Sequence, residues 1–369
     1  MVTFESICLG KLSELIQTRM VILNTIINQM KKIVFSLILV FSFFETSYGQ
    51  HERIIEKWKT ETIYDNDLGE INYHIYKNKI DSRKPLIVYL QGSTNLPLFY
   101  IKPNSKYYSN GITLNVNSMS NDYHIVLISK PNTPLADSIK IAPSGRKYYP
   151  MQEGYSEKYS LDWRADSADK VIDDVLNKLQ VDTSTIIIWG HSEGSQVAPA
   201  VAVRNKKVTH VIAMMGNSLN HLYDFILNER VSALNGQKSS EEAQANIDSL
   251  YLEFEKIYKD PKSTSKEWFG ETYYKWSSFT LNSPIDHMLK LDIPILYVAG
   301  GEDHHSILNM DYAKLEFLRK GKDNLTYKVY PNCDHFFLET KIDESGKKEW
   351  IDHLDEVNVF ALQWVKEKL

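Results

Sequence analysis

Cysteine is scarce in this sequence, which has only 2 among its 369 residues. This scarcity excludes the small secreted domains that depend on several disulfides. Neither sign of charge is in large excess, because 42 lysines and arginines face 47 aspartates and glutamates. Such a balance excludes a broad basic surface, so we expect no nucleic-acid partner. Hydrophobic residues make up 43% of the chain and charged residues 24%, which also excludes disordered and collagen-like chains and predicts one or two globular domains.

Long hydrophobic runs are also lacking, except near the N-terminus. Residues 33–44 are apolar apart from two serines and follow Met30-Lys31-Lys32, and the small residues Ser47 and Gly49 come shortly after them. A basic start, a short apolar segment and small residues before a cleavage point are typical of a signal peptide. We therefore expect residues 30–49 to be a signal peptide that is cleaved near Gly49.

This interpretation divides the chain into three parts. Residues 1–29 become an upstream extension, and residues 50–369 become the working domain, exported to the periplasm or the exterior with no stable membrane insertion. Cleavage removes Cys8 and leaves Cys333 alone, so no internal disulfide is expected. The alternative is an uncleaved anchor over residues 21–44, but polar residues interrupt that stretch at a cost in lipid.

The predicted strands favour a mostly parallel sheet. Residues 60–64 and 71–76 flank a turn-rich linker and predict an antiparallel hairpin. Later runs are apolar on both faces, which is typical of parallel strands that are covered on both sides. These runs are 86–90, 124–128, 185–189, 208–214, 293–298 and, more weakly, 325–330.

Helical periodicity fills several gaps between these runs, at residues 165–179, 192–203 and 350–369. Strands that alternate with helices predict an α/β fold, a mostly parallel central sheet flanked by helices, with the hairpin at one edge. Residues 217–290 interrupt the alternation for about seventy-five residues, too many for an ordinary connection. Because residues 239–260 have helical periodicity, we expect a helical, lid-like insertion over one end of the sheet.

The motif Gly190-His191-Ser192-Glu193-Gly194 stands between a predicted strand and a predicted helix. G-x-S-x-G in this position predicts a tight turn that needs glycine on both sides and holds the serine hydroxyl clear of the backbone. The N-terminus of the following helix favours negative charge on a reacting oxygen. Ser192 is therefore the candidate nucleophile.

A serine nucleophile needs a general base, and the base needs an acidic residue to orient it. The strand at 293–298 is followed by Glu302 and Asp303, and the strand at 325–330 is followed by His335. The chain therefore contains a serine, an acid and a histidine in that order, each after a predicted strand.

With these motifs, most of residues 60–369 resembles the α/β-hydrolases. The resemblance implies the α/β-hydrolase fold, with Ser192 as nucleophile, Asp303 as the acid and His335 as the general base. Glu302 is the alternative acid, since either carboxylate can orient the histidine in this fold.

The resemblance also implies an oxyanion hole made of two backbone N–H groups. One belongs to Glu193, after the nucleophile, and the other belongs to Ser93, in the loop Gln91-Gly92-Ser93 after the strand at 86–90. In the family that loop often begins with His-Gly. This chain has Gln91 in place of the histidine, so the detailed geometry of the loop is expected to differ.

Other polar residues near these motifs have simpler interpretations. His191 is expected to be a packing residue, while the side chain of Glu193 is expected to form hydrogen bonds near the turn. His304 and His305 suggest a metal site, but neighbouring residues point apart and nothing else has ligand spacing. We expect no metal and no cofactor.

These residues predict a secreted serine hydrolase that cleaves a carboxylic ester of a small-molecule or peptide acyl substrate. The alternatives are a serine peptidase of the aminopeptidase or prolyl-peptidase kind, an acyl thioesterase, and a non-catalytic binding protein on the same fold. Specificity is expected from the insertion and from the loop at 130–135. Trp268, Tyr273 and Trp276 are candidate substrate-binding residues, although most such aromatics pack an insertion onto the body. The oligomeric state is not indicated.

Overall fold

The structure is a computed structural model that describes residues 54–105, 107–343 and 345–369. Contacts divide the chain into the units 1–54 and 55–369, and only the second is considered below. The expected upstream extension and signal peptide lie outside the described residues. Within the described ranges, no helix has the length and apolar character needed to cross a membrane. Cys333 is buried and forms no disulfide.

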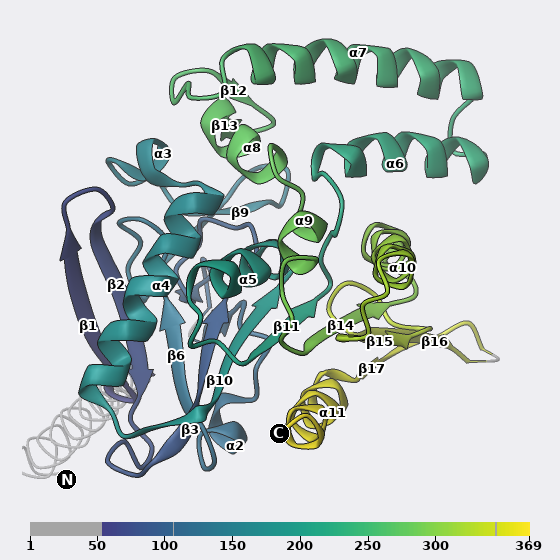
Figure 1. The fold of residues 1–369 in the computed structure, drawn as a ribbon. Coiled ribbons are helices and arrows are strands. Elements are labelled where there is room, and N and C mark those ends of the chain that lie inside the picture. Colours follow the sequence, from purple (N-terminus) through teal and green to yellow (C-terminus); the bar gives the residue numbers. More distant parts are fainter. Residues whose placement is uncertain (1–53, 106, 344) are drawn as a thin grey trace, which may run out of the picture. The chain divides into compact units, whose positions relative to one another are not determined.

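An eight-stranded sheet forms the centre of this unit, in the order β1-β2-β6-β3-β10-β11-β14-β15 (Figure 1). β1 and β2 form an antiparallel hairpin at one edge, and β2 is antiparallel to β6, whereas the remaining neighbours are parallel. The predicted mostly parallel sheet with an edge hairpin is therefore confirmed. The strands are β1 (Trp58–Asp65), β2 (Gly69–Tyr76), β3 (Lys84–Leu90), β6 (His124–Ile128), β10 (Val181–His191), β11 (His210–Met214), β14 (Ile295–Gly300) and β15 (Leu325–Tyr330).

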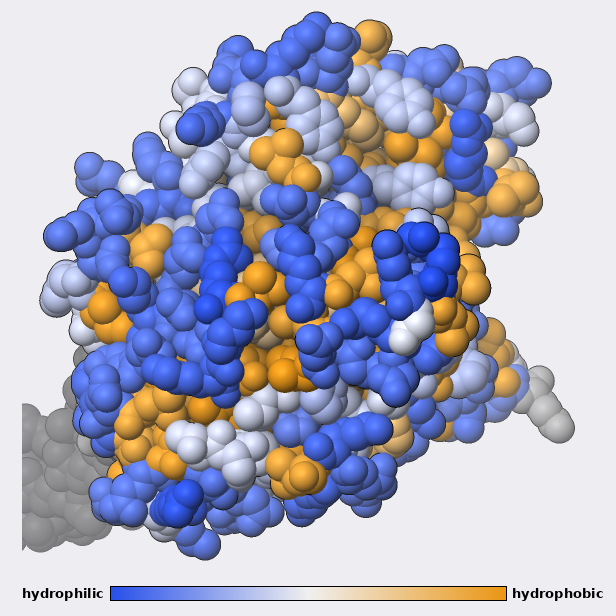
Figure 2. Space-filling view, in the orientation of Figure 1, coloured by the Kyte–Doolittle hydropathy of each residue, from blue (hydrophilic) through white to orange (hydrophobic). Residues whose placement is uncertain are grey.

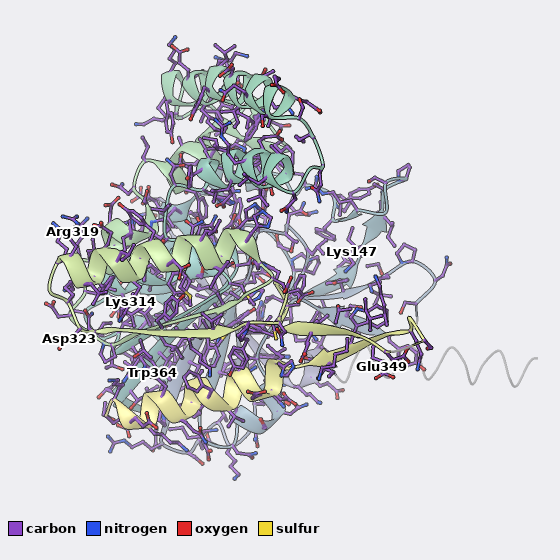
Figure 3. The ribbon with its side chains drawn as sticks, turned by 90° about the vertical axis from the view of Figure 1, so that its right-hand side faces the viewer. Lys147, Lys314, Arg319, Asp323, Glu349 and Trp364 are labelled. Atoms are coloured by element: carbon purple, nitrogen blue, oxygen red, sulfur yellow. The ribbon has the colours of Figure 1, made fainter. Side chains whose placement is uncertain are left out.

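The central strands are buried on both faces because their sequences are apolar at consecutive positions. In β10, for example, Ile186, Ile187, Ile188 and Trp189 have no exposed surface. Helices cover both sides of the sheet, and they are α2 (Val116–Met119), α3 (Tyr155–Lys158), α4 (Leu161–Lys178), α5 (Glu193–Arg204), α10 (His304–Arg319) and α11 (Leu354–Glu367). α4 and α5 lie in front of the sheet in Figure 1, and α10 and α11 lie on opposite sides of β15 in Figure 3.

Local sequence explains where these helices begin. α4 starts at Leu161 because the hydroxyl of Ser160 accepts a hydrogen bond from the backbone N–H of Trp163 (3.1 Å), a typical N-cap. α11 is held against the sheet by the indole N–H of Trp364, which donates to the Thr326 hydroxyl (2.8 Å).

The predicted helix over residues 350–369 began too early. Residues up to Asp352 belong to β17 (Lys348–Asp352), which pairs with β16 (Leu338–Ile342) as an antiparallel hairpin. The Asp352 carboxylate then accepts from the backbone N–H of Leu354 (2.8 Å), and α11 starts there.

Short strands form two further small sheets at the surface, and none was predicted because each is only two or three residues long. β4 (Phe99–Ile101), β5 (Tyr108–Asn110) and β7 (Ala136–Ser138) form one of them, and β8 (Lys140–Ile141) and β9 (Lys147–Tyr148) form the other.

The predicted helical insertion lies above the end of the sheet to which the parallel strands point (Figure 1). It contains α6 (Leu222–Leu234), α7 (Ser240–Lys259), β12 (Glu267–Trp268), β13 (Glu271–Thr272), α8 (Tyr273–Thr280) and α9 (Pro284–Met288). Leu222, Phe254 and Ile257 form its core with Tyr273 and Trp276. Figure 2 shows hydrophobic residues between α6 and α7 beneath a hydrophilic outer surface.

Candidate active site

Ser192 lies in the turn between β10 and α5, with φ 55° and ψ −126°. A positive φ is costly for a residue other than glycine and persists only where the surroundings impose it. The turn is so tight that only glycine fits on either side of Ser192. A Cβ at Gly190 would lie 2.1 Å from the Gly194 carbonyl oxygen, and a Cβ at Gly194 would lie 2.0 Å from the Leu90 carbonyl oxygen. The G-x-S-x-G spacing is therefore a steric requirement of this turn.

His335 and Asp303 form a hydrogen-bonded pair, with Nδ1 and Oδ2 2.5 Å apart. Asp303 also accepts from the Ser306 hydroxyl (2.7 Å) and is the N-cap of α10. Burial opposes ionisation of Asp303, but the hydrogen bond and charge of His335, together with Ser306, outweigh it and hold the pKa at about 2. An ionised Asp303 requires the proton on Nδ1 of His335, which leaves Nε2 free to act as a base.

The loop that carries His335 packs against the nucleophile turn. The His191 Nε2–H donates to the His335 carbonyl oxygen (3.2 Å), and the two imidazole rings are 5.3 Å apart. Burial and the neighbouring His335 lower the pKa of His191 to about 3, so His191 is a neutral packing residue. Within the described ranges, no hydrogen bond joins Ser192 Oγ to His335; such contacts often tighten only when substrate binds.

The other polar candidates have different partners. Glu302 has no side-chain partner in the described part of the chain, so the acid that orients His335 is Asp303. His304 and His305 both contact the Asn228 side-chain oxygen, at 3.0 and 2.9 Å. No cluster of potential metal ligands occurs among the residues that the structure describes.

The loop that follows β3 touches the nucleophile. A Cβ at Gly92 would lie 3.2 Å from Cβ and 3.6 Å from Oγ of Ser192. The Lys130 ammonium donates to the carbonyl oxygens of Gly92 and Thr94, each at 2.7 Å. The Gly92 carbonyl and the Ser93 N–H belong to one trans peptide plane and point in opposite directions. Lys130 therefore fixes the direction of the Ser93 N–H.

The Glu193 side chain lies at the centre of a buried charge cluster. Its carboxylate is 2.9 Å from Arg164 Nη1, 3.1 Å from Lys275 Nζ and 3.7 Å from Lys130 Nζ, and it accepts from the Tyr159 hydroxyl. Burial raises the pKa of Glu193, but the three cations and the hydroxyl reverse this effect and hold it well below its usual value. We call Glu193, Arg164, Lys130 and Lys275 the elbow cluster.

The elbow cluster also explains the departure at Gln91. Arg164 Nη2 donates to the Gln91 carbonyl oxygen (2.6 Å) while Nη1 of the same guanidinium binds Glu193. The loop is thus held through its backbone by Arg164 and Lys130, independently of the side chain at residue 91. Nothing in the sequence pattern indicated these buried cations. Lys130, expected to contribute to specificity with the 130–135 loop, is instead a buried support of the loop that follows β3.

Only one of the three candidate substrate-binding aromatics borders the site. Trp276 and Ser93 line the same cavity of about 520 Å³. Tyr273 packs into the core of the insertion, and its hydroxyl donates to Glu253 (2.5 Å). Trp268 lines a separate hollow of about 600 Å³ within the insertion. The structure thus brings Ser192, His335, Asp303 and the Gln91–Ser93 loop together, and leaves Tyr273 and Trp268 outside.

No protein-family model and no curated protein matches the sequence. Solved structures do match the fold. A putative dipeptidyl aminopeptidase IV from Bacteroides ovatus aligns with 85% of this chain and 36% of its own length, at a TM-score of 0.51 and 14% identity. The fold is that of the α/β-hydrolases. The acylaminoacyl peptidase of Pyrococcus horikoshii, with a TM-score of 0.50 and 12% identity, aligns over 85% of this chain and 42% of its own.

This α/β-hydrolase-fold chain thus spans well under half the length of those two structures. The residues named above lie where the fold binds ligands, beyond the carboxyl ends of its parallel strands. Ser192 follows β10, Asp303 follows β14 and His335 follows β15.

Replacing Lys130 by methionine tests whether this lysine holds the loop that follows β3 in this α/β-hydrolase fold. Methionine fills a similar volume but leaves the Gly92 and Thr94 carbonyls without their donor, so the Ser93 N–H loses its fixed direction. Loss of one oxyanion donor costs about a hundredfold or more in kcat. We expect a loss of that order in kcat with a smaller change in KM, measured by steady-state kinetics. Lys140→Met, at an exposed position, is the control, and an unchanged kcat in Lys130→Met would contradict this role.

Proposed function

We propose that this protein is a serine hydrolase that cleaves an amide or peptide bond through an acyl-enzyme. The observation that carries the proposal is the strained Ser192 turn packed against a histidine whose Nδ1 is bound to a half-buried, ionised Asp303. These are the groups needed for a nucleophile, a general base and an orienting acid.

Each step has a group to perform it. Ser192 Oγ attacks the substrate carbonyl carbon while His335 Nε2 takes its proton, and Asp303 stabilises the resulting imidazolium. The N–H groups of Ser93 and Glu193 stabilise the oxyanion. His335 then gives the proton to the leaving amine as the C–N bond breaks. Water, deprotonated by His335, releases the acid and restores Ser192.

The choice of an amide bond reverses the order favoured by the sequence, which placed an ester first. Its support is that the two solved structures of matching fold are named a dipeptidyl aminopeptidase and an acylaminoacyl peptidase. Those names describe those proteins; for this chain they make the amide bond the first to be tested.

Labelling with a fluorophosphonate tests the nucleophile. The probe phosphonylates a serine only when a base activates it, so we expect stoichiometric labelling of the wild type and none of Ser192→Ala. The matched control is Ser195→Ala, which removes a nearby hydroxyl that donates to the Ser192 carbonyl oxygen. Peptide mass mapping identifies the labelled residue, and a label elsewhere would refute the assignment of Ser192.

A panel of substrates tests whether the enzyme cleaves amide or ester bonds. Aminoacyl and N-acyl-aminoacyl 4-nitroanilides are compared with the matching 4-nitrophenyl esters, relative to the spontaneous rate of each. We expect turnover of the anilides by the wild type but not by Ser192→Ala. Turnover of esters with none of the anilides would restore the esterase interpretation.

A further inference from the structure

A cavity of about 520 Å³ begins beside the proposed oxyanion loop. Ser93 and Thr94 line one side of it, and a Cβ at the preceding residue, Gly92, would lie 3.6 Å from Oγ of Ser192. Residues 146–151 and the segment 269–276 of the insertion line other sides. Its volume suits a small ligand. A group attached to a carbonyl at Ser192 can therefore extend into this cavity.

Positive charge predominates among the side chains that line the cavity, since Arg146, Lys147 and Lys275 face a single carboxylate, Glu271. The guanidinium of Arg146 has no ion pair or hydrogen bond within the described ranges; its Nη1 lies 3.8 Å from where a Cβ of Gly270 would be. Lys147, which Figure 3 labels on β9, contacts the uncharged Tyr100 hydroxyl (3.2 Å).

The acidic groups nearby do not balance these cations. Lys275 is paired with Glu193 (3.1 Å), but Glu193 is shared with Arg164 and with Lys130, whose pKa burial lowers to about 7, so at neutral pH this carboxylate faces at least two buried cations. Burial raises the pKa of Glu271, and the positive charges of Lys275, Lys130 and Arg146 oppose this effect. The histidine of the lining, His221, has a pKa lowered to about 3 by burial and by Lys275, and adds no charge.

We propose that this cavity binds a carboxylate of the substrate, on the same molecule as the scissile carbonyl. The inference rests on the proposed function and names its substrate class: short acyl or peptide compounds with a free carboxylate. Arg146 at the exposed rim and Lys275 in the interior are the cations available to it. Hydrogen bonds to charged groups are strong enough to give about a ten- to hundredfold preference.

Matched substrates test this preference. Butanoyl, succinyl and 4-aminobutanoyl 4-nitroanilides have chains of similar length that end in a methyl, a carboxylate or an ammonium group. Alanyl-alanine with a free or an amidated C-terminus places the carboxylate on the leaving side. We expect kcat/KM to be about ten- to hundredfold higher for the carboxylate member of at least one set. The ammonium compound should be the slowest, and a preference for it would overturn the proposal in favour of recognition by Glu271.

Two variants test whether Arg146 is responsible for the carboxylate preference. Arg146→Met should reduce the carboxylate preference severalfold, whereas Lys140→Met, an exposed change on the same β8–β9 hairpin outside the cavity lining, should leave it intact. An equal loss of the carboxylate preference in both variants would contradict a specific role of Arg146.

Calorimetry separates the two proposals. Wild-type protein is titrated with succinamic acid and with butanamide, which differ only in the carboxylate, and tighter binding of succinamic acid is expected. Turnover of neutral substrates without any carboxylate preference in rate or binding overturns this inference alone. Absence of all turnover, with succinamic acid still preferred, overturns the proposed function and leaves the carboxylate site standing.

Discussion

Replacing Asp303 by asparagine should lower kcat/KM about ten-thousandfold while the protein stays folded. Asparagine is as good an N-cap as aspartate, so α10 keeps its start at His304. What is lost is the carboxylate that holds the proton on Nδ1 of His335. The asparagine amide can donate to Nδ1, which stabilises the wrong tautomer and places the proton on Nε2, where the base must be free.

The measurement is steady-state kinetics on the best substrate, together with a thermal unfolding curve. Glu302→Gln is the matched control, because it neutralises the adjacent carboxylate without touching His335, and its activity should remain near that of the wild type. A large loss in Glu302→Gln, with little loss in Asp303→Asn, would show that the neighbouring acid orients the histidine.

Replacing Glu193 by glutamine should destabilise the fold by about 3–5 kcal/mol, the usual cost of removing one partner from a buried ion pair. Glutamine keeps the shape but removes the negative charge that contacts Arg164, Lys130 and Lys275. Arg164 cannot lose its proton, so its charge remains buried and uncompensated. Because Arg164 and Lys130 hold the carbonyls of the Gln91–Thr94 segment, labelling of Ser192 should fall as well.

Urea unfolding and fluorophosphonate labelling rates measure the two effects. Glu157→Gln removes an exposed carboxylate on α3 and should leave both unchanged. The double variant Glu193→Gln, Lys275→Met lacks one of the unbalanced cations, so part of the lost stability should return. The difference between its free energy of unfolding and the sum of the two single effects measures the interaction between Glu193 and Lys275. Full stability of Glu193→Gln alone would mean that the cluster is not held by this carboxylate.

The sequence predicted the parts of the fold and site that follow from local patterns. The central strands are apolar on both faces, so their burial and parallel order could be inferred. Ser192, Asp303 and His335 were proposed because each follows a predicted strand. The β16–β17 hairpin was missed because the apolar Trp350 and Ile351 continue the helical pattern that follows them.

The contacts around the site could not be predicted in the same way. Lys130, Arg164 and Lys275 come from three distant segments, and a buried cation has no spacing or periodicity that distinguishes it from an exposed one. Tyr273 and Trp276 are three residues apart on α8, yet only Trp276 lines the cavity. Which of the two side chains faces the cavity depends on how the insertion packs on the rest of the domain, and the sequence around α8 does not determine that packing.

Lys275 gives the insertion a part in the chemistry that its position above the sheet does not suggest. It is a residue of α8, yet its ammonium pairs with the carboxylate of the residue that follows the nucleophile. Exchange or deletion of the insertion would therefore change the charge around the oxyanion loop as well as the shape of the cavity. If the proposed function holds, the Lys275–Glu193 pair links the insertion to the Ser192 turn through one carboxylate, so a designed change of the insertion should keep a cation at residue 275 or change Glu193 with it.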